Sequence, residues 1–194
     1  MSVIAEALGI PDVVVINLKK FGDDRGFFSE TYSKPAFAEA GVHVEFVQDN
    51  HALSANKGTV RGLHFQIPPF EQAKLVRVTR GAILDVAVDL RFGSPTYGRY
   101  VSAVISAESW NQIFIPVGFA HGLLTLEPNT EVLYKVSNVY SPEHDKGVLW
   151  NDPTLAINWP VNAGDAILSD KDRSQPMFSD LPAYFRHEPD EVKR

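Results

Sequence analysis

The chain of 194 residues contains no cysteine, which excludes disulfide bonds, thiolate metal sites and cysteine nucleophiles. It also lacks an apolar run of the roughly 20 residues that a membrane-spanning helix requires. The amino terminus has no basic segment followed by an apolar core, which is the pattern of a secretory signal peptide. These absences predict a soluble, cytoplasmic protein without a membrane partner.

Basic residues are also scarce. The sequence holds 18 Lys and Arg against 24 Asp and Glu, which gives a formal net charge of −6. Proteins bind nucleic acids through phosphates that demand a basic face, so we expect no nucleic-acid partner. A small phosphate-bearing ligand stays compatible with this charge, because a local cluster of arginines can lie within an acidic protein.

The residues that are present favour a β-rich core. Hydrophobic residues make up 44% of the chain and no linker divides it, so we expect one domain over residues 1–194. Short β-branched runs alternate with turn residues, which predicts an all-β fold: an antiparallel β-sandwich or jelly-roll barrel with short peripheral helices. The expected strands are 13–16, 45–48, 74–79, 83–90, 100–105, 112–115 and 131–140.

One internal helix is predicted over residues 34–40. Ser33 can cap its first turn, Pro35 is tolerated there, and Gly41 can end it. From residue 142 onward Pro, Asp and Asn are frequent. We expect packed loops and a short helix at the edge of the barrel in that part.

His64 lies in the stretch RGLHFQ at residues 61–66 and could bind a metal, move a proton or fill the core. In a strand, His64 and Gln66 would share one face, while Leu63 and Phe65 would point to the other. Acid–base chemistry needs no unusual tuning here, because imidazole has the unperturbed pKa nearest neutrality.

A carboxylate beside His64 would fix its tautomer and stabilise the imidazolium. Asp170 and Asp172 are the two candidates, and the local sequence leaves both open. Tyr134 shares a strand face with apolar neighbours and should point inward, where a tyrosine most often fills the core.

A second histidine gives the metal alternative its best support. Pro116, Gly118 and His121 have a Pro-x-Gly-x-x-His spacing that resembles the second sequence motif of cupins, which are small jelly-roll barrels. Metal-binding cupins carry two histidines one residue apart, and then a glutamate, in their first motif. Here Gln66 stands where the second of these histidines would be, and an amide oxygen is a poor substitute for imidazole. A site of two histidines and a carboxylate, with Glu71 at a plausible distance, stays open.

Eight motifs together are similar to one family. Their ordered combination resembles the dTDP-4-dehydrorhamnose 3,5-epimerases from about residue 11 to 182, with 183–194 left as a carboxyl-terminal tail. The motifs are DRGFFSE at 24–30, FVQDNH at 46–51, RGLHFQ at 61–66, KLVR at 74–77, IPVGFAHG at 115–122, LYK at 133–135, LWNDP at 149–153 and SDKD at 169–172.

The resemblance implies a metal-independent cupin without a cofactor, which works as a homodimer in dTDP-L-rhamnose synthesis. Its substrate would be dTDP-4-dehydro-6-deoxy-D-glucose, and C3 and C5 would both be inverted to give dTDP-4-dehydro-L-rhamnose. A ketone at C4 acidifies the hydrogens on both flanking carbons, so one base can remove either of them as an enolate forms. The proton must then return from the opposite face.

The resemblance also implies roles for single residues. His64 matches the base, Tyr134 the general acid, and Asp172 the aspartate that pairs with the histidine. Lys74 matches a lysine beside the C4 oxygen, where an ammonium can stabilise an oxyanion. Asp145 is the nearest match to a glutamate of many relatives, and we assign it no binding role. The substrate-binding positions are matched by Arg25, Glu30, Gln48, Asp49, Asn50, Arg61, Lys74, His121 and Lys171.

Three alternatives stay open. Related enzymes that epimerise only one carbon share nearly all of these residues. A metal-dependent cupin enzyme would bind its ion through His64 and His121. A cupin that only binds a nucleotide or sugar would need neither the base His64 nor the acid Tyr134.

Overall fold

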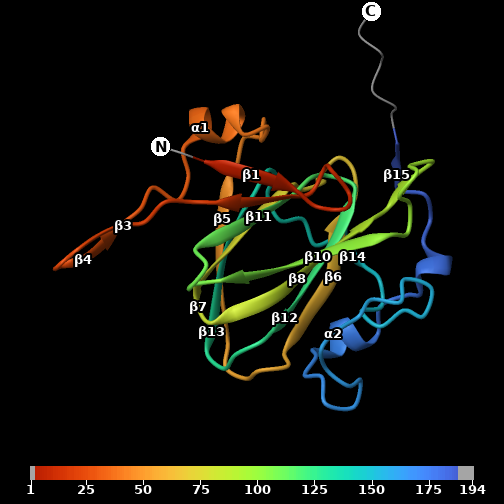
Figure 1. Ribbon diagram of the computed structural model, residues 1–194. Helices are drawn as coiled ribbons and strands as arrows, with labels where there is room; N and C mark the ends of the chain where they lie inside the picture. The colour runs from red at the N-terminus through yellow and green to blue at the C-terminus, as the bar shows by residue number, and fades with distance from the viewer. Residues whose placement is uncertain (1–2, 188–194) are drawn as a thin grey trace, which may run out of the picture.

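The structure is a computed structural model that describes residues 3–187, and its main feature is a pair of facing β-sheets (Figure 1). All strand pairs within both sheets are antiparallel, which confirms the all-β prediction. The six-stranded sheet has the order β1 (Ile4–Ala7), β2 (Val14–Asn17), β11 (Asn111–Ile115), β7 (Lys74–Arg80), β13 (Thr130–Val136) and β5 (Gln48–Ser54). The five-stranded sheet has the order β10 (Tyr100–Ser106), β8 (Ala82–Asp89), β12 (Phe119–Thr125), β6 (Val60–Gln66) and β14 (Asp145–Gly147).

The space between the sheets is filled by alternate residues of their strands. Val76 and Ile113 from the six-stranded sheet pack in one cluster with Ile83, Ala87 and Leu123 from the five-stranded sheet. Because side chains alternate along a strand, the residues between these point to the outer faces. This cluster fills part of the interior between the two sheets.

The carboxyl-terminal third covers the outer face of the five-stranded sheet. Leu63 and Phe65 of β6 pack there against Trp150, Trp159 and Phe185. This part holds a helix, α2 (Asp170–Arg173), and a 3₁₀ turn at Phe178–Asp180. Residues 183–187 of the expected tail belong to this layer, since β15 (Phe185–Arg186) pairs in parallel with β9 (Arg91–Phe92). The rest of the tail lies outside the described residues.

The helix α1 (Lys34–Glu39) covers part of the other outer face, where its Phe37 is fully buried. The predicted helix is confirmed, and Gly41 follows its end with a φ of +91°. Ser33 is the N-cap residue, as predicted, but its side chain makes no capping hydrogen bond. Pro35, the second residue of the helix, has no N–H, which removes one of the two donors that a capping hydroxyl can use.

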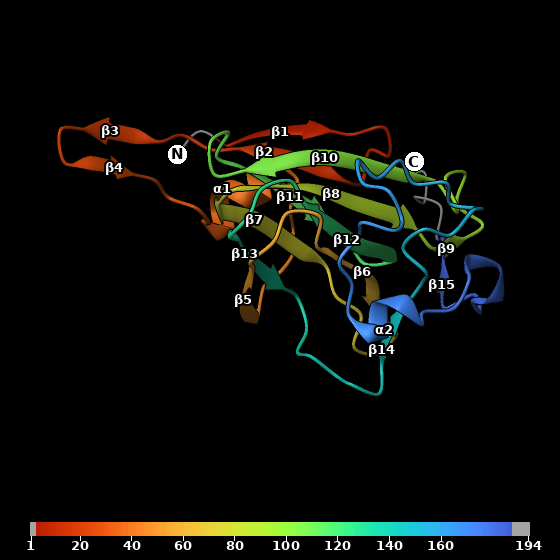
Figure 2. The same ribbon diagram turned by 90° about the horizontal axis from the view of Figure 1, so that it is seen from below.

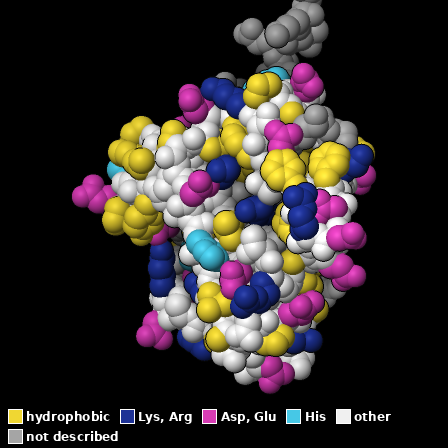
Figure 3. Space-filling model, turned by 90° about the vertical axis from the view of Figure 1, so that its left-hand side faces the viewer, with side chains coloured by type: hydrophobic (Ala, Val, Ile, Leu, Met, Phe, Trp, Pro, Cys, Tyr) yellow, Lys and Arg dark blue, Asp and Glu magenta, His cyan; other side chains and the backbone are white. Residues whose placement is uncertain are grey.

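A β-hairpin projects from the sandwich near the amino terminus. It consists of β3 (Phe21–Asp23) and β4 (Gly26–Phe28), and both views show it extending away from the two sheets (Figures 1 and 2). Phe27 and Phe28 are exposed on it. Figure 3 faces this side of the molecule and shows hydrophobic side chains gathered on one flank. None of the helices within residues 3–187 is long and apolar enough to cross a membrane.

Two strand predictions differ from the structure. The run 45–48 reaches the sheet only at its end, because Phe46 packs against Tyr32 in the layer around α1. The run 131–140 leaves the six-stranded sheet after Val136 and crosses toward β14. Strand β12 is missing from the expected set, and every one of its residues is buried.

Candidate active site

A cavity of about 500 Å³ lies between the two sheets, and we call it the main cavity. His64, Arg61 and His121 line it from the five-stranded sheet. Lys74 and Tyr134 line it from the six-stranded sheet. A side cavity of about 290 Å³ shares His64, Lys74 and Tyr134 with it, so the two cavities are adjacent.

His64 and Asp172 form a close pair on the wall of the main cavity. The Nε2 atom of His64 lies 2.5 Å from Oδ1 of Asp172, although the two residues are 108 positions apart in the sequence. His64 lies on β6, and α2 brings Asp172 to it. The structure therefore places Asp172, and not Asp170, against the histidine. The bond engages one ring nitrogen and leaves the other available to accept a proton.

The surroundings of Asp172 keep it ionised. Burial alone would raise the pKa of Asp172, but hydrogen bonds from His64, from the Ser169 hydroxyl and from the Gly62 N–H outweigh burial and hold the pKa below its usual value. Gly62 has a φ of +112°, and a Cβ there would lie 2.5 Å from the His121 carbonyl oxygen. Only glycine lets β6 and β12 approach so closely at this point.

His121 forms a second histidine–aspartate pair beside the first. It lies on β12 directly opposite His64 in the strand register, and its Nε2 is 2.9 Å from Oδ2 of Asp85. Asp85 is fully buried on β8, and its other oxygen has no hydrogen-bond partner among residues 3–187. Both residues of this pair are buried, whereas His64 is 30% exposed. The sheet itself therefore holds His121 in place.

Tyr134 and Lys74 face these histidines from the opposite sheet. Burial raises the pKa of Tyr134 above its usual value, so its hydroxyl keeps its proton at neutral pH. Burial lowers the pKa of Lys74 to about 8, even though the nearby Asp145 and Asp85 carboxylates favour the charged form. The Lys74 ammonium lies 3.5 Å from the His64 carbonyl oxygen, which places it beside His64.

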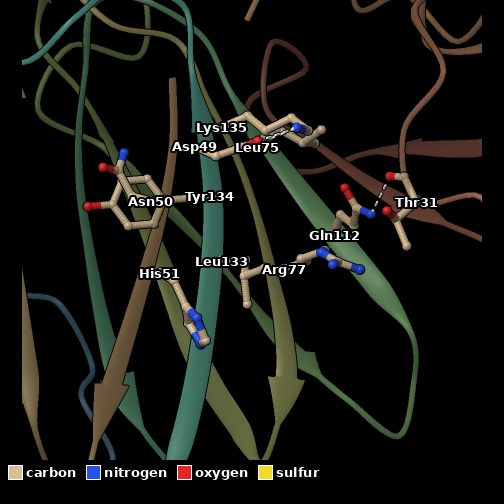
Figure 4. A pocket seen from close by; sticks show the side chains of 10 residues that line it. All are labelled: Thr31, Asp49, Asn50, His51, Leu75, Arg77, Gln112, Leu133, Tyr134 and Lys135. Atoms are coloured by element: carbon tan, nitrogen blue, oxygen red, sulfur yellow. Dashed lines mark hydrogen bonds and ion pairs between the residues drawn. The ribbon is translucent and has the colours of Figure 1, made fainter. Parts of the chain in front are cut away.

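The stretch Gln48, Asp49 and Asn50 is divided between the two faces of β5. Gln48 and Asn50 line the side cavity, and the Gln48 amide donates to Asn50 at 2.9 Å. Asp49 points outward and forms an ion pair with Lys135 at 2.8 Å. Figure 4 shows Asn50 and Tyr134 on one side of the sheet and the Asp49–Lys135 pair on the other, where a shallower hollow of about 230 Å³ lies. Only Gln48 and Asn50 of this stretch therefore reach the side cavity.

Two further cationic side chains lie near the rim of these cavities. Arg61 donates to the Ser54 hydroxyl at 3.1 Å and to the Leu53 carbonyl oxygen at 3.2 Å, which holds its guanidinium in the main cavity. Lys171, next to Asp172 on α2, is 2.5 Å from the Asp145 carboxylate. Asp145, to which we assigned no binding role from the sequence, lines the side cavity.

Arg25 and Glu30 lie apart from the cavity in this single chain. Arg25 is at the tip of the projecting hairpin, where it pairs with Asp23. Both Arg25 and Glu30 are exposed, and neither lines the main or the side cavity. Of the nine expected binding residues, five line the main or the side cavity. Lys171 lies near the rim, and Asp49 faces outward.

The donor set does not match a cupin metal site. Gln66 uses both amide hydrogens and its oxygen for backbone partners, so this side chain is already engaged. His64 and His121 each hold a carboxylate through Nε2. Within residues 3–187, no three His, Asp or Glu side chains are grouped as metal ligands.

The same combination of motifs and fold occurs in known proteins. The family model of dTDP-4-dehydrorhamnose 3,5-epimerase matches residues 7–180. The chain belongs to this family. A dTDP-4-dehydrorhamnose 3,5-epimerase of Sinorhizobium fredii is 52% identical over 182 residues, which cover 94% of this chain and 93% of the relative.

Two solved structures of this family have the same architecture. The dTDP-4-dehydrorhamnose 3,5-epimerase of Bacillus anthracis, with TDP and pyrophosphate bound, is 49% identical with a TM-score of 0.87, covering 91% of this chain and 99% of that one. An enzyme of Legionella pneumophila in complex with dTDP-4-keto-L-rhamnose is 37% identical with a TM-score of 0.91, covering 96% and 100%. The cupin-type fold expected from the sequence is thereby confirmed.

Sequence reasoning missed two residues of the site. Asp85 interrupts the apolar strand β8, and an acid between buried neighbours was a signal that could have revealed it. The role of Gln66 had no such signal, because its partners lie in segments that only the folded chain brings near.

Proposed function

We propose that this protein epimerises dTDP-4-dehydro-6-deoxy-D-glucose at C3 and C5 and produces dTDP-4-dehydro-L-rhamnose. One observation carries the proposal: the His64–Asp172 pair and the Tyr134 hydroxyl come from opposing sheets and face one cavity. Inversion requires a base on one side of the sugar and an acid on the other. The sugar nucleotide bound to the Legionella relative supports this choice of substrate.

His64 begins the reaction as the base. Its free ring nitrogen takes the proton from C3 or C5, and the electrons of the broken C–H bond form the enolate while negative charge develops on the C4 oxygen. Asp172 stabilises the imidazolium that results, as a carboxylate does in other histidine–aspartate pairs. The same base serves both carbons in turn, because both flank the ketone.

Lys74 and Tyr134 complete the inversion from the other wall. The Lys74 ammonium stabilises the oxyanion at C4. Tyr134 then donates its hydroxyl proton to the carbon from the face opposite His64, and the enolate electrons form the new C–H bond. Tyr134 regains a proton and His64 releases one through exchange with solvent, so no net proton is consumed.

The nucleotide end of the substrate carries a diphosphate. We assign its binding to Arg61 and Lys171, which lie at the rim of the cavities. A planar guanidinium can hold phosphate oxygens through paired hydrogen bonds. We propose that Gln48 and Asn50 bind polar groups of the substrate in the side cavity. His121 would bind a hydroxyl of the sugar in the main cavity.

A homodimer accounts for the residues that stand apart. We propose that the projecting hairpin of one subunit reaches the cavity of the other, and that Arg25 and Glu30 bind substrate there. The exposed Phe27 and Phe28 supply apolar surface for such an interface. We further propose that the whole chain is one epimerase domain that acts in the cytoplasm, where nucleotide sugars are made.

The decisive experiment follows both carbons at once. The protein is incubated with dTDP-4-dehydro-6-deoxy-D-glucose in deuterated water, and NMR reports deuterium and configuration at C3 and C5. Deuterium and inversion at both positions are expected. Exchange at one carbon alone would establish the single-carbon alternative, and no exchange at either would refute the epimerase proposal.

A further inference from the structure

The segment of residues 137–144 crosses from one sheet to the other at the side cavity. It leaves β13 in the six-stranded sheet and enters β14 in the five-stranded sheet, and Figure 2 shows it swinging out below the sandwich. Tyr140 lies on this segment, is 56% exposed as a residue, and lines the side cavity. Its hydroxyl donates to the Asp145 carboxylate at 3.0 Å. Tyr140 and Asp145 together form one wall of that cavity.

Gln66 holds this segment through its backbone. The Gln66 Nε2 donates to the carbonyl oxygens of Phe70 at 2.6 Å and Val139 at 3.1 Å, and its Oε1 accepts from the Ser141 N–H at 2.7 Å. An amide side chain has two donor hydrogens and one acceptor oxygen, and Gln66 uses all of them on backbone groups. Gln66 is only 3% exposed, so these bonds also satisfy its polar atoms where water is excluded.

A second glutamine, Gln48, bonds to Tyr140, which lies between Val139 and Ser141. Gln48 Oε1, on the edge strand of the six-stranded sheet, accepts from the Tyr140 N–H at 3.2 Å. Three consecutive residues, Val139 to Ser141, are therefore held by one glutamine from each sheet. Because Tyr140 is largely exposed, these backbone bonds and the bond from its hydroxyl to Asp145 decide where its side chain lies.

Other bonds between the same segments stop short of Tyr140. The Gln72 amide donates to the Asn138 carbonyl oxygen at 2.8 Å, and the Ser137 hydroxyl accepts from the Ala73 N–H at 2.8 Å. They attach the beginning of the crossing segment to the loop before β7. Within residues 3–187, the bonds from other segments to the backbone of Val139–Ser141 come from the two glutamines, and Gln66 supplies two of these three bonds.

We propose that Gln66 is a positioning residue for substrate binding, which holds the Val139–Ser141 backbone so that Tyr140 and Asp145 form a fixed wall of the side cavity. The inference rests on the proposed function for the identity of the substrate. Gln66 follows His64 by two residues on the same face of β6, so one strand sets both the base and this wall. Since the Gln66 side chain is hydrogen-bonded to backbone groups and, within residues 3–187, not to His64, its effect should fall on binding and leave the chemical step intact.

The first test compares two variants with a matched control. Gln66→Met keeps the volume and removes all three bonds, whereas Gln66→Glu keeps the acceptor for Ser141 and directs a carboxylate at two carbonyl oxygens. We expect each to raise KM about 10-fold and to change kcat by less than about 2-fold. The control, Ser137→Ala, removes one bond between the same segments and should leave KM unchanged. A fall in kcat at constant KM, or an equal rise of KM in the control, would overturn the proposal.

The second test asks whether Gln66 acts through Tyr140. In a Tyr140→Ala background, Gln66→Met should raise KM no further, because the side chain that Gln66 positions is already missing. Independent, additive effects of the two substitutions would contradict the proposal. The dissociation constant of dTDP, measured by calorimetry, should follow the same pattern in all variants.

Two measurements keep this inference separate from the proposed reaction. If the wild-type protein epimerises no dTDP-4-keto sugar, the dTDP dissociation constants still decide the role of Gln66. Amide hydrogen exchange of the wild-type protein needs no variant that must fold: the Ser141 N–H should be protected like the amides of β6, although it lies outside any strand. Exchange of Ser141 as fast as that of an unbonded loop amide would refute the proposal.

Discussion

The two walls of the main cavity carry different kinds of polar group. The five-stranded sheet presents His64 and His121, each bonded to a carboxylate. The six-stranded sheet presents Tyr134 and Lys74, and burial shifts the pKa of each toward its uncharged form. One wall can thus take up a proton and stabilise the charge that results, while the other can give a proton and neutralise an oxyanion.

This division follows from the sandwich itself. A sugar between two sheets exposes one face to each, so a base and an acid on different sheets reach opposite faces of one carbon. Within the five-stranded wall the two histidines also differ. Asp172 reaches His64 from α2, which follows a segment hydrogen-bonded to the start of β6, whereas Asp85 reaches His121 from the neighbouring strand and is fully buried. The more exposed histidine is the better placed to meet substrate.

Removal of the base should have the largest effect. We expect His64→Ala to lower the rate of deuterium exchange at C3 and C5 by roughly 10²- to 10⁴-fold, because no enolate can form without a base. His121→Ala is the matched control on the same wall and should keep measurable exchange, with its main loss in binding. NMR in deuterated water measures both. If His121→Ala abolished exchange while His64→Ala retained it, the roles of the two histidines would be reversed.

Removal of the acid should separate exchange from inversion. In Tyr134→Phe the enolate still forms and His64 can return a solvent deuteron from the original side. We therefore expect inversion to fall by roughly 10²-fold, while exchange with retained configuration falls much less. Phenylalanine keeps the ring volume, so thermal unfolding should stay close to that of the wild type. Inversion at the wild-type rate would show that the six-stranded wall does not supply the proton.

Local sequence patterns were sufficient for much of the fold and for the residues within strands. The inward direction of Tyr134 and the shared face of His64 and Gln66 follow from strand periodicity and agree with the structure. From the local sequence, the partner of His64 stayed open between Asp170 and Asp172. Asp172 is 108 residues away from His64, and no local rule predicts that α2 lies against β6. The resemblance, and not periodicity, favoured the second of them.

The remaining differences arise where a chain segment changes sheets or is buried on both faces. Strand 131–140 looked continuous, but the chain changes sheets after Val136, and the bonds that hold the crossing segment come from Gln48 and Gln66. Strand β12 is buried on both faces, so it shows none of the alternation by which a half-buried strand is recognised. Where a strand ends, and whether both its faces are buried, depends on the segments that pack against it in the folded chain.

The charge of Lys74 should limit activity at high pH. Its pKa of about 8 means that the ammonium is present below pH 8 and is lost as the pH rises through that value. The kcat/KM value should fall about 10-fold per pH unit above the pKa, since it reports groups of the free enzyme. Arginine stays charged at these pH values, so any activity that Lys74→Arg retains should not show this fall of kcat/KM at high pH. A fall that persists in Lys74→Arg would belong to another group.

The same pKa makes a statement about stability. The pKa of Lys74 is lower in the folded protein than its usual 10.5, so the unfolded chain holds this proton more tightly between about pH 8 and 10.5. Stability from this group therefore rises with pH across that window, and below it the buried charge is unfavourable. We expect Lys74→Met to unfold at a higher temperature than the wild type at pH 7 while losing activity. An unfolding temperature below that of the wild type would contradict the assigned burial cost.

The smallest effect is expected at the rim of the five-stranded wall. Arg61→Ala should raise KM about 10-fold and change kcat by less than about 2-fold, because the diphosphate that we assign to Arg61 has the same charge in the ground and transition states. Arg61→Lys keeps the charge but loses the planar pair of donors, so its KM should lie between those of the wild type and Arg61→Ala. Lys74→Ala on the opposite wall should behave in the contrary way, with its loss mainly in kcat. A large fall in kcat for Arg61→Ala at constant KM would move Arg61 from the binding group to the chemical step.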